Sequence, residues 1–179
     1  MSELFSIQLQ NRQQQGRDGI WLDLPTTTEQ VQAALRQIGI SSDNPQGLFI
    51  SGYFAEEEKR FAIPYNMVLA SNVDELNFLA SRLETLSTGE RAELNAALQA
   101  PQSELFSIGR ITDFPENVDY YVHLPDVHGP AQLGDYYLNR SGMVDMPEEW
   151  KGGIDTAQFG RYVAQQEQGV FTEYGYLVK

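Results

Sequence analysis

The sequence predicts an α+β protein made of three consecutive modules, at residues 1–64, 65–102 and 103–179. The first and third segments combine short apolar runs of strand character with a helical pattern, and the middle segment carries helical patterns alone. Hydrophobic residues make up 41% of the 179 residues and aromatic residues 11%, which is typical of a folded chain. We therefore expect small antiparallel sheets with a helix at both ends, flanking a helical middle module.

The first module is predicted to hold two strands, a helix and a hairpin. Apolar positions within residues 4–9 indicate one strand, and the run IWLDL indicates a second strand that stops at Pro25. Capping-box spacings that begin at Thr26 and Thr27 precede apolar residues at helical intervals, up to a stop at Gly39. The runs LFISGYF and KRFAIPY flank three glutamates, a pattern that predicts a hairpin with a charged tip.

The middle module is predicted to be a pair of helices. Asn72 stands three residues before Glu75, and the leucines of the run VDELNFLASRLETL fall on one helical stripe. Ser87 and Glu90 repeat the capping spacing ahead of a second apolar edge, which Pro101 ends.

The third module returns to strand patterns. We expect strands at ELFSIGRI and VDYYVHL, a short helix at PAQLGDYYL, a helix over residues 155–168 that Gly169 closes, and one terminal strand over residues 170–179. The hexapeptide SELFSI occurs at residues 2–7 and again at 103–108. Either duplication of one α+β unit or coincidence explains this repeat, and the sequences that follow the two copies do not align.

The charge of the chain favours a basic partner. Asp and Glu number 25 against 12 Lys and Arg, so the formal net charge is -13. A field of this sign repels nucleic acid and anionic lipid, although acidity also serves simply to keep a protein in solution. The N-terminal run has no basic start followed by an apolar segment, and eighteen apolar residues never occur together, so we expect a cytoplasmic protein.

No pattern in the sequence indicates catalysis. The chain has no Cys, and it lacks the nucleophile-elbow, phosphate-loop, zinc-helix and calcium-loop motifs. Its two histidines, His123 and His128, bracket Asp126 and could in principle hold a divalent metal, but polar residues in a surface loop are the commoner explanation of such a pattern. We expect no enzyme activity, no cofactor and no metal.

The carboxylates are the candidate functional groups. They are dispersed over the chain, and a line of fixed carboxylates can match the phosphates of duplex DNA, which carries one charge per roughly 1.7 Å of its axis. The alternative is a solvated acidic face. The predicted partner-binding residues are Glu56, Glu57, Glu58, Asp74, Glu75, Asp113, Glu116, Asp119, Asp135, Asp145, Glu148 and Glu149.

Three sequence runs give the chain a resemblance to the ArdA family of antirestriction proteins. These runs are QNRQQQGRDGIWLDLP, VDELNFLASRLETL and GGIDTAQFGRYVAQQEQGVFTEYGYLV, in this order along nearly the whole chain. The stretch LGDYYLNRSGMVDMPEEW matches the family's acidic segment only loosely. The resemblance implies an elongated chain of three small domains that dimerises through its C-terminal part.

The function implied by this resemblance is inhibition by DNA mimicry. Proteins of the family occupy the DNA-binding groove of type I restriction-modification enzymes, on the methyltransferase core, so that incoming mobile genetic elements survive. The runner-up hypothesis is an acidic adaptor or regulatory protein of a mobile element that binds another basic protein. A metal-dependent hydrolase that uses His123, Asp126 and His128 is the third.

Overall fold

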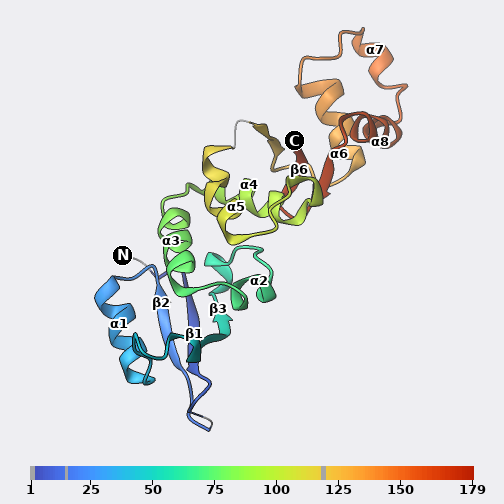
Figure 1. Ribbon diagram of the computed structural model, residues 1–179. Helices are drawn as coiled ribbons and strands as arrows, with labels where there is room; N and C mark the ends of the chain where they lie inside the picture. The colour runs from blue at the N-terminus through green and yellow to red at the C-terminus, as the bar shows by residue number, and fades with distance from the viewer. Residues whose placement is uncertain (1–2, 15, 118–119) are drawn as a thin grey trace. The chain divides into compact units, whose positions relative to one another are not determined.

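The computed structural model describes residues 3–14, 16–117 and 120–179, and it confirms the predicted α+β class (Figure 1). The described residues form helices and two small sheets, and each sheet is antiparallel and three-stranded. The chain divides into two compact units, one formed by residues 1–87 and 105–114, the other by residues 88–104 and 115–179. None of the helices in the described part of the chain combines the length and the apolarity that crossing a bilayer requires.

The first unit is built on a sheet of strand order β2-β1-β3. Its elements are β1 (Phe5–Asn11), β2 (Ile20–Leu24), α1 (Thr28–Gln37), η1 (Pro45–Gly47), β3 (Leu48–Phe54), η2 (Glu57–Lys59), α2 (Tyr65–Leu69), α3 (Val73–Glu84) and α5 (Ile108–Asp113). Alternate residues of β1 are buried, which is the period-2 pattern of a strand with one face on a core. Ile7 and Leu9 have no exposed surface at all.

Side-chain hydrogen bonds fix the helices of this unit to the sheet. Thr27 caps α1 by accepting from the backbone N–H of Gln30, as the sequence predicts. The buried Asn11, at the end of β1, donates through Nδ2 to the carbonyl oxygen of Ile38 over 2.9 Å. Asn77 of α3 makes two hydrogen bonds with the backbone of Thr26. Its Oδ1 accepts from the N–H over 2.7 Å, and its Nδ2 donates to the carbonyl oxygen over 2.9 Å.

The second unit is built on a sheet of order β4-β6-β5. Its elements are α4 (Thr88–Gln99), η3 (Pro101–Ser103), η4 (Phe114–Glu116, which begins at the last residue of the first unit), β4 (Val122–Leu124), α6 (Pro130–Asp135), the π-helical turn η6 (Tyr136–Arg140), α7 (Glu148–Lys151), α8 (Thr156–Glu167), β5 (Val170–Thr172) and β6 (Gly175–Val178). Its core gathers Val127, Leu133, Ala164 and Tyr176. Helices α6 and α8 pack against each other, and α4 contacts β6.

Two predicted strands are wrong. Within the described part of the chain, residues 60–64 of the run KRFAIPY form no strand: they follow the turn η2, and Pro64 is the N-cap of α2. The second half of the run ELFSIGRI, residues 108–111, forms the start of α5 instead, and residues 104–107 precede the helix. Ser107 caps that helix by accepting from the backbone N–H of Arg110, and Ile108 and Ile111 are buried at helical spacing.

Two further predictions of strands need correction. The strand predicted at VDYYVHL is confirmed only over β4, and residues 118–119 lie outside the described residues. The single terminal strand is a hairpin of β5 and β6. Thr172 closes its turn by accepting from the N–H of Tyr174 and donating to the carbonyl of Gly175, whose φ is +114°.

The two copies of SELFSI adopt different structures. Phe5 of the first copy is buried in β1, whereas Phe106 of the second is 70% exposed in the turn before α5. The repeat therefore marks no repeated structural unit.

Candidate functional site

The carboxylates predicted to bind a partner lie at turns, loops and helix ends, in both units. Asp119 lies outside the described residues. Of the eleven others, Asp135 is half-buried and the rest are exposed. Within each unit they come from several separate segments of the chain.

Glu56, Glu57 and Glu58 lie where the chain leaves β3. The sequence predicts a hairpin tip there, and the structure places them instead in the turn η2 and the residue before it. The Nζ atom of Lys59 lies 3.4 Å from a carboxylate oxygen of Glu56. All three glutamates are exposed, so the turn presents a compact group of negative charge that one lysine partly offsets.

Asp74 and Glu75 occupy the first turn of α3. Asn72 caps this helix, as the sequence predicts, by accepting from the backbone N–H of Glu75 over 2.9 Å. Carboxylates in a first helical turn are stabilised by the unpaired N–H groups and by the helix dipole. This position explains the two acids structurally, and it also holds their charges at a fixed place on the surface.

Asp113 and Glu116 follow each other closely in the chain but belong to different units. Asp113 is the last residue of α5, and Glu116 is the last residue of η4. Both side chains are exposed.

Asp135 makes two polar contacts within the second unit. Its carboxylate accepts from Nδ2 of Asn139 over 2.8 Å and lies 3.6 Å from Nε of Arg140. The Arg140 guanidinium also stacks over the ring of Tyr136. Asp135 therefore stabilises the junction between α6 and the π-helical turn, and its charge is partly offset within the protein.

The connection between this turn and α8 carries three of the predicted acids. Asp145 precedes α7, and Glu148 and Glu149 form its first turn. Glu148 pairs with Lys151 at 2.7 Å, but its side chain stays 81% exposed. A surface ion pair of this kind contributes about 1 kcal/mol or less, so Glu148 can change partner at little cost.

The histidines do not form a metal site in the part of the chain that the structure describes. The Nε2 atom of His123 lies 2.7 Å from the carbonyl oxygen of Tyr174, so it donates its proton there and cannot bind a metal through the same atom. His128 is exposed, and its backbone N–H donates to Gln132. No group of acidic and histidine side chains with metal-binding geometry occurs among the described residues.

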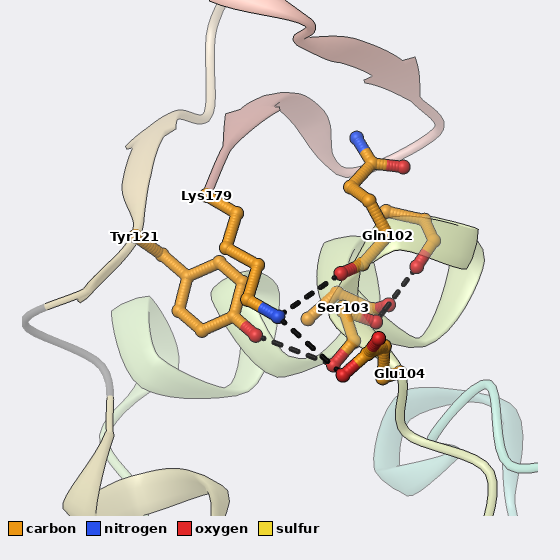
Figure 2. Close-up of polar contacts among 7 residues, drawn as sticks. Gln102, Ser103, Glu104, Tyr121 and Lys179 are labelled. Carbon is orange, nitrogen blue, oxygen red and sulfur yellow. Dashed lines mark hydrogen bonds and ion pairs between the residues drawn. The ribbon is translucent and has the colours of Figure 1, made fainter.

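Figure 2 shows a polar network that the sequence does not predict, at the turn after α4. The Nζ atom of Lys179 donates to the carbonyl of Gln102 over 3.3 Å and lies 3.8 Å from the carboxylate of Glu104. The hydroxyl of Tyr121 donates to the carbonyl of Ser103, and burial, followed by the negative charge of Glu104, raises the pKa of Tyr121. The network ties the C-terminal end of β6 to this turn, so it holds Glu104 in place.

Glu167, near the end of α8, has a structural role. Its two carboxylate oxygens accept from the hydroxyl groups of Tyr137 and Tyr176, the second bond measuring 2.9 Å. Burial and these hydrogen bonds raise the pKa of both tyrosines above the ordinary value. The arrangement joins the π-helical turn, α8 and β6, and it removes Glu167 from the set of available surface charges.

The exposed carboxylates described above can attract positively charged groups of a partner electrostatically. A model of the family of the antirestriction protein ArdA matches residues 15–178 of the chain. None of the curated proteins compared with the chain matches it.

Proposed function

The chain belongs to the ArdA family of antirestriction proteins, and on this premise we propose that it inhibits type I restriction-modification enzymes as a DNA mimic. In this proposal the protein occupies the DNA-binding groove of the methyltransferase core and presents carboxylates where phosphates would lie. Inhibition then requires no catalysis by the inhibitor. The match over nearly the whole chain carries the proposal.

The distribution of charge supports it. Acidic residues outnumber basic ones in each of the two units, and the net charge of the chain is -13. At one charge per roughly 1.7 Å, this corresponds to about 22 Å of duplex. A homodimer, the state that we propose for the active protein, would match about twice that length. Phosphate contacts give affinity without sequence preference, so such a mimic need not reproduce base edges.

The proposed binding surface consists of the carboxylates predicted from the sequence. Five of them are exposed and take part in none of the ion pairs described above for residues 3–14, 16–117 and 120–179: Glu57, Glu58, Glu75, Asp145 and Glu149. They are therefore the strongest candidates for contact with the basic groove. Three others already pair with a basic side chain of the protein: Glu56, Asp135 and Glu148. To bind a basic side chain of the partner, each would first have to leave that internal pair. The division into three modules, with dimerisation through residues 103–179, remains part of this proposal.

A competition experiment tests the function. The purified protein is titrated into a type I methyltransferase core that holds labelled duplex DNA, at low and at moderate salt. We expect displacement of the DNA, weaker at the higher salt because the contacts are between charges. The absence of displacement at both salt concentrations would contradict the proposed target and favour another basic partner, as for an acidic adaptor of a mobile element.

A further inference from the structure

A groove lies beside the first turn of α3, within the first unit. Its volume is about 670 Å³, and its wall includes Pro64, Met67, Ala70, Glu75, Phe106 and Ile108. These residues come from α2, from α3 and from the turn that leads into α5. All of them belong to the same compact unit, so the groove does not depend on the placement of the second unit.

Phe106 is the exceptional residue of this wall. Its side chain is 70% exposed, although Ile108, two residues further along, is buried in the core. Helix α5 begins at Ile108 and contacts α3, so the turn that carries Phe106 is anchored on the protein directly after the exposed ring. Aromatic residues, Phe included, are enriched in the cores of protein–protein interfaces, so an exposed ring at the edge of a groove is suited to burial in a complex.

The groove carries a negative charge beside its apolar wall. Glu75 is the one charged side chain among the described lining residues, and Asp74, its neighbour on the same turn, is exposed. The Asn72 cap holds this turn. Arg110 is close in sequence, but its side chain is not part of the wall. The groove therefore complements an apolar group that lies next to a cation.

We propose that this groove receives an apolar side chain of the basic protein partner, one that lies beside a Lys or Arg of that partner. Phe106 and Met67 cover the apolar side chain, and Glu75 pairs with the cation. This inference rests on the proposed function and deepens it, because it assigns to the complex a contact that DNA itself cannot make. The affinity then has a component that resists salt, in addition to the salt-sensitive attraction between charges.

A pair of matched substitutions tests the contact. Phe106→Ala removes the exposed ring from the groove, and Phe78→Ala removes a ring that is 60% exposed on α3 but does not line the groove. In the competition experiment at moderate salt, we expect Phe106→Ala to weaken displacement by about tenfold or more, and Phe78→Ala by about twofold or less. Equal effects of the two substitutions would overturn the proposal.

A second measurement separates this inference from the proposed function. Dodecyltrimethylammonium, which joins an alkyl chain to a cation, is added below its micelle-forming concentration while NMR follows the methyl group of Met67. We expect a saturable shift that Phe106→Ala abolishes and Glu75→Gln weakens. The absence of a shift in the unsubstituted protein would overturn the groove assignment, even if the protein displaces DNA. Binding of the probe without displacement of DNA would instead overturn the type I target alone and support the groove.

Discussion

Gly160 of α8 packs directly on the backbone of Gly134 in α6. A Cβ atom added at Gly160 would lie 2.9 Å from the backbone nitrogen of Gly134 and would overlap the carbonyl of Pro130. A Cβ atom at Gly134 would overlap the carbonyl of Thr156. The two helices therefore cross with their backbones in contact, and neither position has room for a side chain.

Gly160→Ala is accordingly expected to destabilise the second unit. The added methyl group meets backbone and not the flexible end of a side chain, so α6 and α8 must separate, at a cost of about 1–3 kcal/mol or more. Urea unfolding followed by circular dichroism measures the change. Gly89→Ala is the control, because a Cβ atom there meets nothing within 4 Å. An effect of Gly160→Ala no larger than that of the control would contradict the close crossing.

Asn11→Asp is expected to destabilise the first unit by about 1–3 kcal/mol. The side-chain amide of Asn11 donates to the carbonyl of Ile38, and an aspartate would place a buried carboxylate against that oxygen. Thermal unfolding near neutral pH is the measurement. Asn66→Asp, at an exposed position of α2, adds the same charge without burying it and should change stability little. Similar midpoints for the two variants would show that the Asn11 bond is dispensable.

The stability of the second unit is expected to fall at alkaline pH. Burial and the hydrogen bonds to Glu167 raise the pKa of Tyr137 and Tyr176 above the ordinary value of 10.0. The folded protein thus holds these protons more tightly than the unfolded chain. Their contribution to the free energy of unfolding is complete below about pH 10 and decreases as the pH rises above it.

The double variant Tyr137→Phe, Tyr176→Phe removes both ionising groups. Its free energy of unfolding should therefore decline less between pH 9 and the alkaline range, which denaturant titrations at several pH values can measure. A decline as steep as that of the unsubstituted protein would mean that other groups cause the alkaline loss.

Binding to the restriction enzyme is expected to tolerate single charge reversals. An exposed charge contributes about 1 kcal/mol or less, so Glu58→Lys alone should weaken competition with DNA by a few-fold at most. Reversal of Glu57, Glu58, Glu75 and Glu149 together should abolish it at moderate salt, with the fold checked by circular dichroism. Loss of all inhibition from Glu58→Lys alone would be inconsistent with a distributed mimic.

Elements with local signals were predictable from the sequence. The caps at Thr27 and Asn72 satisfy helix N–H groups within three residues, so their spacing predicts the start of α1 and of α3. The apolar alternation of β1 likewise reports a strand with one buried face. The strand predicted at ELFSIGRI is wrong because Ser107 caps a helix there. The apolar pattern of this run gives no sign of that cap.

Features that depend on distant residues were not predictable. Gly169 follows the end of α8 as the sequence predicts, but the left-handed residue that caps the helix is Gln168, with a φ of 56°. Glycine stands at position 169 because a Cβ atom there would overlap the hydroxyl of Tyr176. In the candidate site, residue type alone predicted the exposed acids. The pairing of Asp135 with Arg140, the two tyrosines on Glu167 and the groove at Phe106 required the tertiary structure.

The path of the chain through its two units has a consequence for synthesis. Helix α3 packs against α5, yet residues 88–104 of the other unit are made between them. During translation, the face of α3 that α5 contacts therefore stays uncovered until residues 105–114 have left the ribosome. A nascent chain that stops at residue 87 holds the whole first sheet but lacks Ile111, which has no exposed surface in the finished fold. The first unit thus completes its core only when more than half of the protein has been translated.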